Sequence, residues 1–244
     1  MGEWFDGLKA DFINNFITDN RWSNLATGLK NTIIITVCAA LIGVVLGIIV
    51  AAVRTTYDKN KESMARNGKL GYAIMTFFNW VCKVYLSIFR GTPIVVQLMI
   101  MYFIVLTSIK NGVTVAIIAF GINSGAYVAE IFRGGIMAID HGQFEAGRSL
   151  GFNYIQTMIF IVLPQVIKNI LPTLLNEFIA LLKETSVAGY VGITDLTRGG
   201  YIIRGVTFSA FMPLIAIALI YLIIVLFLTR MVGILERRLR KSER

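Results

Sequence analysis

The chain has 244 residues, of which 56% are hydrophobic and only 15% are charged. A soluble domain of this length would carry about 25% charged residues, so the composition argues against a soluble protein. The net charge of +9 does not indicate nucleic-acid binding, because the basic residues lie between apolar runs, where they act as topology signals. Only two cysteines occur, Cys38 and Cys82, and both lie in apolar stretches without metal-ligand or disulfide spacing.

The N-terminal residues 3–17 place large apolar side chains on one helical stripe. Trp4, Leu8, Phe12 and Phe16 recur every four residues, and most of the charged residues lie off this stripe. The pattern predicts a helix that lies in the membrane interface, with an unstructured polar tail as the alternative. The N-terminus shows no cleavable signal pattern.

Apolar runs further along the chain, three of them uncharged, predict five membrane spans, since about 20 apolar residues are enough to cross the hydrocarbon. The spans are expected at 31–53, 91–109, 113–133, 155–182 and 205–229. A basic hydrophilic loop is expected at 54–71. Residues 70–82 are apolar but too few to cross the membrane, because Lys83 and Arg90 follow them. We therefore expect an approach helix along the interface at 70–82. The predicted fold class is an all-α integral membrane protein.

Basic residues between the spans predict the topology. Thirteen lie on the side that holds 54–69, 133–155 and the C-terminal tail, against seven on the other side. The positive-inside rule therefore places the N-terminus outside and the tail in the cytoplasm. The expected domains are an external segment at 1–28, a transmembrane domain at 29–232 and a basic cytoplasmic tail at 233–244.

Residues 140–164 form a polar island between two spans. Asp140 followed by Gln143 suggests a helix start with a capping box, and Gly151 interrupts before a second helix. A cytoplasmic loop that contains two short helices is suited to being held by a partner protein. An amphipathic loop helix that lies on the membrane is the alternative.

The spacing of this island resembles the signature of the membrane subunits of bacterial ABC importers. The matching residues are Glu145, Ala146, Gly147, Gly151, Leu163 and Pro164. Gly147 departs from the pattern, because the family usually has Ala there, and Gly would loosen the helix by about 1 kcal/mol while keeping the surface small. The resemblance implies a coupling loop, at about 137–156, that docks on a cytoplasmic ATPase through these six residues.

Other segments resemble the polar amino acid branch of the same permease family. They are 89–93 together with Gln97, 127–136, 176–178 and 183–186. The resemblance implies the five-helix type I ABC importer permease fold, with coupling helices on the cytoplasmic side. The implied partners are an ABC ATPase dimer, a second copy of the chain or a related permease, and an extracytoplasmic amino-acid-binding protein. Basic, amide and sulfur-containing amino acids share these motifs.

The chain has no motif of its own for ATP hydrolysis. Its nearest approach to a phosphate-binding loop is Gly68-Lys69, which Leu70 follows in place of Ser or Thr. His141 is the sole histidine, and we interpret it as a solvated loop residue. We therefore expect no enzyme activity, metal or cofactor in this chain, and expect ATP and Mg²⁺ in the partner ATPase.

Polar residues within the spans are candidates for a substrate path. The fourth span is expected to be broken by Pro164 and Pro172, and broken helices offer free backbone groups to a zwitterion. Glu177 lies in this span, where a carboxylate is costly unless it faces a pore or a partner. The other candidates are Gln97, Asn123 and Ser124, for which hydrogen bonding between helices is the alternative.

Four charged residues near the spans are candidates for gating or structural ion pairs: Arg90, Glu130, Arg133 and Lys168. Glu130 and Arg133 are expected to pair near the cytoplasmic mouth. For Glu177, pairing with Lys168 or with the backbone is the structural alternative to a role in the path.

Two other function classes compete with the importer. A secondary transporter or channel without an ATPase would couple to ions through Glu177 and Glu130. A membrane anchor for an assembly would transport nothing. Neither class needs a docking helix at 140–164.

Overall fold

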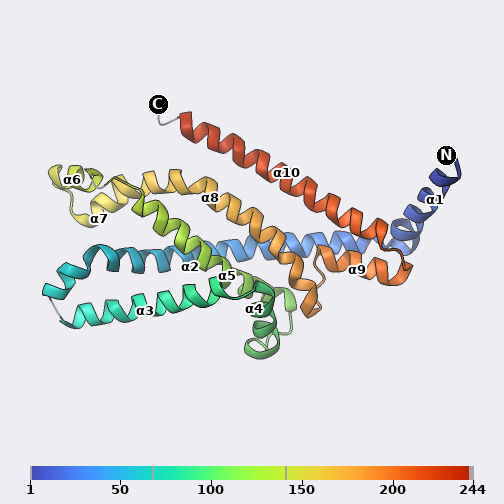
Figure 1. Ribbon diagram of the computed structural model, residues 1–244, viewed down its shortest axis with the longest axis horizontal. Coiled ribbons are helices and arrows are strands. Elements are labelled where there is room, and N and C mark those ends of the chain that lie inside the picture. The colour runs from blue at the N-terminus through green and yellow to red at the C-terminus, as the bar shows by residue number, and fades with distance from the viewer. Residues whose placement is uncertain (1, 68, 141, 242–244) are drawn as a thin grey trace. The chain divides into compact units, whose positions relative to one another are not determined.

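The computed structural model describes residues 2–67, 69–140 and 142–241 (Figure 1). These residues form helices joined by short turns, with no strand among them. The α-helices are α1 (Gly2–Phe12), α2 (Trp22–Asn67), α3 (Lys69–Gly91), α4 (Ile94–Ile100), α5 (Gly112–Met137), α6 (Gly142–Ser149), α7 (Tyr154–Thr157), α8 (Leu163–Glu184), α9 (Leu196–Thr207) and α10 (Phe211–Lys241). Gly68, His141 and the last three residues of the basic tail lie outside the described residues.

Five helical stretches of the described chain are long and apolar enough to cross a membrane. They are Trp22–Lys59, Lys69–Gly91, Gly112–Met137, Tyr154–Val191 and Phe211–Leu239. The predicted all-α class and the number of spans are therefore confirmed. The third stretch differs from the others, because 67% of its most apolar window is buried, against 11% for the second and the fifth. It is therefore the most buried of the five stretches, and the others expose much more of their apolar surface.

The predicted boundaries of the second span were wrong. The expected interfacial helix at 70–82 and the charged interruption belong to one continuous helix, α3. The run expected as the span, 91–109, contains only the short apolar helix Ile94–Val105, which at 1.5 Å per residue reaches about 18 Å. Lys83 does not interrupt α3, which ends at Gly91, one residue after Arg90. The guanidinium of Arg90 has a carboxylate partner, Glu130, at 3.7 Å.

The predicted loop at 54–71 was also wrong, because α2 continues as a helix of 46 residues as far as Asn67 (Figure 1). Hydrophilic composition does not end a helix, and residues 54–67 contain neither glycine nor proline. The extension of α2 packs against the start of α3, where the rings of Tyr57 and Tyr72 stack with centroids 6.3 Å apart.

The chain divides into two compact units. The first consists of Met1–Ala39, Ile94–Phe120 and Ile179–Met231, and the second of Ala40–Pro93, Gly121–Phe178 and Val232–Arg244. The core of the first unit contains Phe16, Leu25, Leu196, Ile203 and Ile217. The largest core of the second contains Ala51, Val128, Phe132, Ile136, Phe144, Val162, Val166 and Ile170.

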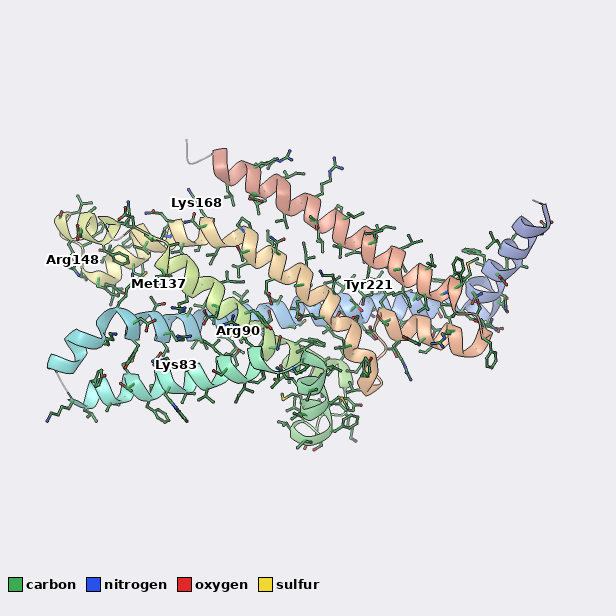
Figure 2. The ribbon with its side chains drawn as sticks, viewed as in Figure 1. Lys83, Arg90, Met137, Arg148, Lys168 and Tyr221 are labelled. Carbon is green, nitrogen blue, oxygen red and sulfur yellow. The ribbon has the colours of Figure 1, made fainter. Side chains whose placement is uncertain are left out.

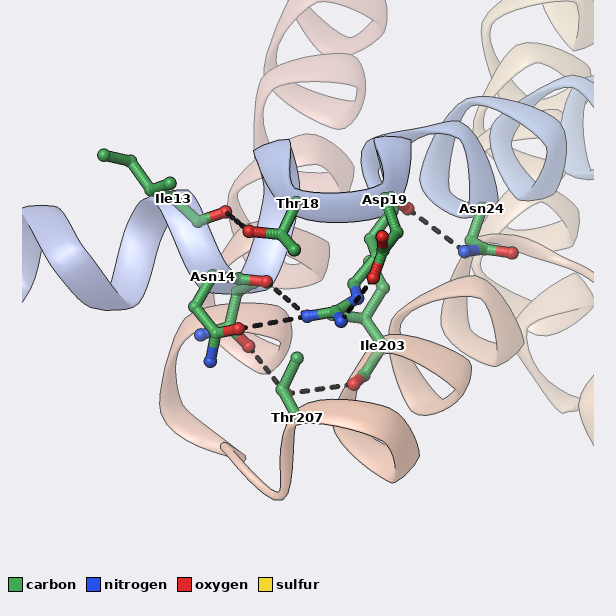
Figure 3. A network of polar contacts seen from close by, with 9 residues as sticks. Ile13, Asn14, Thr18, Asp19, Asn24, Ile203 and Thr207 are labelled. Atoms are coloured by element: carbon green, nitrogen blue, oxygen red, sulfur yellow. Dashed lines mark hydrogen bonds and ion pairs between the residues drawn. The ribbon is translucent and has the colours of Figure 1, made fainter.

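In the first unit, a hydrogen-bonded turn joins α1 to α2 (Figure 3). Arg21 donates to the backbone oxygen of Asn14 at 2.6 Å and forms an ion pair with Asp19 at 2.8 Å. The predicted N-terminal helix is confirmed as a helix, but the large apolar side chains of its predicted stripe do not share one environment. Phe16 packs in the core while Phe12 is half exposed. Its place in a membrane interface stays a prediction.

The first unit also holds α9, a helix that was not predicted and that begins between the predicted fourth and fifth spans. Asp195 caps this helix by accepting hydrogen bonds from the backbone N–H groups of Thr197, at 3.1 Å, and Arg198, at 3.0 Å. The carboxylate is fully buried. Burial raises the pKa of the Asp195 carboxyl above its ordinary value, and the N–H groups of Arg198 and Thr197 oppose that rise.

The fourth candidate span had been expected to break at its prolines, but it is continuous. The turn Met158–Val162 is a π-helix, and it leads directly into α8 one residue before Pro164. Pro172 lies within α8. A proline removes one i→i−4 hydrogen bond without ending the helix when packing supports its neighbours. A proline in this helix therefore leaves one backbone carbonyl without its helical partner, whereas a broken helix would have offered two free helix ends to a substrate.

Candidate functional site

The loop between α5 and α8 contains two short helices, α6 and α7, as predicted, but its capping was predicted wrongly. Asp140 accepts a hydrogen bond from the backbone N–H of Gly142 at 2.8 Å. The side chain of Gln143 does not complete a capping box, because its Oε1 accepts from Gln165 at 3.1 Å. The capping box lies instead at the start of α7, between Asn153 and a glutamine three residues later.

An aromatic side chain anchors α6 to the second unit. Phe144 is buried in the main core of that unit. Its ring stacks on Tyr154 with centroids 6.1 Å apart, and the Nζ of Lys59 lies 3.7 Å from its centroid. A cation at this distance over a ring is attracted to the face of the ring. The extension of α2 therefore holds α6 directly.

Gly147 on α6 packs closely against Thr157 on α7. A Cβ atom at this position would lie 2.6 Å from both Oγ1 and Cγ2 of Thr157. This glycine was expected to keep the outer surface of the helix small, but Gly147 is buried. The departure from alanine is explained by the β-branched neighbour, which leaves no room for a methyl group.

Gly151 is needed for a different reason. Its φ is +82°, which L-residues rarely adopt, and a Cβ there would meet no heavy atom within 4 Å. The chain uses this residue to reverse direction between α6 and α7. The demand for glycine therefore comes from the backbone and not from lack of space.

The remaining residues of the predicted coupling set lie partly at the surface. Glu145 and Ala146 are exposed on α6, Pro164 is exposed on α8, and Leu163 is half-buried. Large apolar side chains stand beside them, with Leu150 at 71% exposure. Arg148, on the last turn of α6, is exposed as well (Figure 2). This end of the second unit thus combines a rigid anchor with a mixed acidic, basic and apolar surface.

A second group of predicted residues forms an ion-pair network around Glu130 on α5. Its carboxylate lies 2.9 Å from Arg54, 3.7 Å from Arg90 and 3.4 Å from the Nε of Arg133. Arg133 also approaches Asp58 at 3.8 Å. The predicted pairing of Glu130 with Arg133 is therefore present in the structure.

Two members of this network were missed by sequence reasoning, namely Arg54 and Asp58. Both lie in the part of α2 that was expected to be a loop. Their four-residue spacing would have placed them on one face if the helix had been extended past the apolar run. Lys168, which had been considered as a partner of Glu177, is exposed on α8 and pairs with none of the described carboxylates (Figure 2).

The candidate path residues of the second unit face polar partners inside it. Ser124 donates a hydrogen bond to Glu177 at 3.1 Å, which replaces the pairing with Lys168 considered above. Asn123 is buried and donates to the backbone oxygen of Phe89 at 3.0 Å. These contacts join α5 to α8 and to α3.

Gln97, the remaining path candidate, lies on α4 in the first unit and is 6% exposed. The role of all four residues in a path stays a prediction.

A family model and individual relatives both indicate that this chain is similar to transport permeases. Residues 43–241 match the family model described as binding-protein-dependent transport system inner membrane component. The arginine transport system permease protein ArtQ of Bacillus subtilis is 38% identical over 221 residues, which cover 88% of this chain and 92% of the relative. The glutamine transport system permease protein GlnP of Escherichia coli K12 is 38% identical over 181 residues, covering 71% and 83%.

Solved structures that resemble this chain are also ABC transporters. The chain is similar to a crystal structure of an amino acid ABC transporter with histidines, with a TM-score of 0.77 and 36% identity over 91% of this chain and 98% of that one. An inward-facing MetNI methionine ABC transporter shares the fold, with a TM-score of 0.71 at 19% identity over 88% and 95%. The chain belongs to the family of inner membrane components of binding-protein-dependent transport systems, and has the fold of a type I ABC importer permease.

Proposed function

We propose that the chain is the membrane subunit of an ATP-driven importer of polar amino acids. Permeases named for arginine and glutamine are 38% identical to it over most of its length. It would act with an extracytoplasmic binding protein, and with a second copy of itself or a related permease across the path.

The surface of α6 is the observation that carries the proposal. Phe144 and Gly147 fix this helix to the second unit, while Glu145 and Ala146 stay exposed. A helix that is firmly held at its back and open at its front can transmit a displacement to the spans. We infer that this front docks on a cytoplasmic ATPase dimer, which would bind the ATP and Mg²⁺.

The proposed topology follows from the same assignment. The loop with α6 and the tail lie in the cytoplasm, and α1 and α9 lie outside. A binding protein would then deliver the amino acid at the side of α9. Ser124 and Glu177, which join α5 to α8, together with Asn123 and Gln97, are the proposed polar groups of the path. The Glu130 network is the proposed gate or brace at its inner end.

The structure does not favour ion coupling through the two membrane carboxylates. Glu130 is engaged by three guanidinium groups, and Glu177 accepts a hydrogen bond from Ser124. A carboxylate that takes up protons or cations during transport would have to give up these partners.

Affinity capture from mild detergent tests the proposal. The chain is co-expressed with the ABC ATPases of its own genome and purified through a tag. Recovery of one ATPase is expected with the wild type. A loss of about ten-fold is expected with Glu145→Lys, since reversing a charge at an interface costs on the order of 1–3 kcal/mol.

Asp11→Lys is the matched control. It also reverses one exposed acidic side chain, but on α1, at the opposite side of the proposed topology. It should recover the ATPase fully. Failure of the wild type to retain any ATPase, or equal recovery by Glu145→Lys, would refute docking on α6.

A further inference from the structure

The second unit contains a cavity of about 700 Å³ with an excess of positive charge. It is bordered by α2, α3 and α5. Its lining residues are Arg54, Lys83, Leu86, Ser87, Arg90, Gly91, Tyr127 and Glu130. Three cationic side chains thus face a single carboxylate, and Lys83 and Arg90 both project from α3 (Figure 2).

The one carboxylate of the cavity does not satisfy these cations. Glu130 is shared by Arg54, Arg90 and Arg133, which lies beyond the lining. Lys83 pairs with none of the carboxylates that the structure describes. The Nε of Arg54 is buried and has no hydrogen-bond partner in the described part of the chain. Cations are costly at membrane depth unless they meet negative charge, so the cavity is suited to an oxyanion.

The arrangement selects against a zwitterion. A free amino acid carries an ammonium group beside its carboxylate, and that group would need an acceptor in the cavity. Glu130 is the only acidic lining residue, and three guanidinium groups already occupy it. A ligand with a negative group and no ammonium therefore fits better than the amino acids that such importers carry.

The position of the cavity indicates where such a ligand would come from. Arg54 directly follows the uncharged run 31–53, at the depth where hydrocarbon gives way to lipid headgroups. On α3, the stripe next to Lys83 exposes Trp80, Val84 and Ile88. These side chains offer an apolar surface to acyl chains beside the cationic cavity.

We propose that this cavity binds the phosphate headgroup of an anionic phospholipid such as phosphatidylglycerol. Lys83 and Arg90 would contact the phosphate, and the Nε of Arg54 would donate to an oxygen. Basic cavities between spans on the cytoplasmic side are suited to such headgroups. The inference uses the membrane depth of the cavity and does not depend on the transported substrate.

Native mass spectrometry of the full chain, released from nanodiscs with equal phosphatidylglycerol and phosphatidylcholine, tests the proposal. The wild type should retain phosphatidylglycerol in preference to phosphatidylcholine. Lys83→Gln should retain about five-fold less, as expected for one basic residue near a headgroup. Lys83→Arg should restore retention. Because Lys83 is exposed and unpaired within the described chain, these variants should fold normally.

Lys69→Gln is the matched control, since it removes the same charge from an exposed position on the same helix. It should retain lipid as the wild type does. Equal retention by Lys83→Gln and the wild type would overturn the proposal. So would equal losses in both glutamine variants, because these would indicate diffuse attraction. Displacement of the lipid by millimolar arginine or glutamine would assign the cavity to the transported amino acid instead.

Discussion

The loops around α9 and α6 both join two spans through a short helix, yet they are built differently. In the α9 loop, Asp195 and Leu196 are fully buried, and the backbone N–H of Leu196 donates to Thr32 of α2 at 3.1 Å. In the α6 loop, one aromatic ring, one glycine and the hydrogen bond between Gln143 and Gln165 make the contacts, while much of the helix stays exposed. The α9 loop is therefore packed inside its unit, whereas the α6 loop leaves much of its helix surface exposed.

The largest effect is expected where backbones touch in the α9 loop. A Cβ at Gly199 would lie 2.4 Å from the backbone oxygen of Asn24 on α2. Gly199→Ala should therefore destabilise the first unit by about 1–3 kcal/mol, because backbone atoms cannot move aside. The melting temperature in detergent measures this loss.

Gly205→Ala on the same helix is the control, since a Cβ there meets nothing within 4 Å. It should leave the melting temperature unchanged or raise it. Equal melting temperatures for Gly199→Ala and Gly205→Ala would show that α9 does not pack on α2 as described.

The contact of Gly147 with Thr157 gives the next largest effect, in the α6 loop. Gly147→Ala should displace α6 and lower ATPase capture several-fold, since the added methyl group meets a β-branched side chain at 2.6 Å. Thr157→Ala removes both clashing atoms, so the double variant should recover part of the loss. A double-mutant cycle of ATPase capture measures the coupling. Strictly additive effects would argue against the contact.

A smaller effect is expected at Gly151, where a side chain would strain the backbone but would contact no other residue. Gly151→Ala should cost about 1–2 kcal/mol of loop stability, because φ is +82°. Hydrogen exchange of the α6 amides should rise accordingly. Gly134→Ala, in the helical part of α5 with open space around it, should not change that exchange. Unchanged exchange in Gly151→Ala would mean that the turn adopts another conformation.

The smallest effect concerns the pH dependence of stability, and it comes from Asp195, the buried carboxyl that caps α9. The folded-state pKa of Asp195 lies above its ordinary value of 3.8, so the folded protein binds more protons than the unfolded chain. The melting temperature should therefore fall as the pH rises through the window just above 3.8. In Asp195→Asn this part of the pH dependence should disappear. If the variant keeps the wild-type pH profile, the carboxyl is not the group responsible.

The sequence predicted those features that depend on composition and local pattern. The number of spans follows from apolar runs, the two short helices around Gly151 follow from a turn residue, and the pairing of Glu130 with Arg133 follows from an i, i+3 spacing. The ends of α2 and α3 could not be predicted in this way, because a hydrophilic stretch without glycine or proline is compatible with either helix or loop. Packing against a neighbouring helix decided in favour of helix.

The site was harder to predict for the same reason. Arg54 and Asp58 belong to the Glu130 network only once α2 is known to continue past the apolar run. The role of Gly147 depends on Thr157, ten residues away on another helix. Such relations are set by tertiary contacts, which no local spacing in the sequence reveals.

The Glu130 network has a consequence for genetic variation. One carboxylate serves three guanidinium groups, so its partners are not equally replaceable. Loss of one arginine leaves two others to hold the carboxylate, whereas loss of the carboxylate leaves three like charges close together. Among natural and selected variants, position 130 should therefore accept far fewer residues than positions 54, 90 or 133.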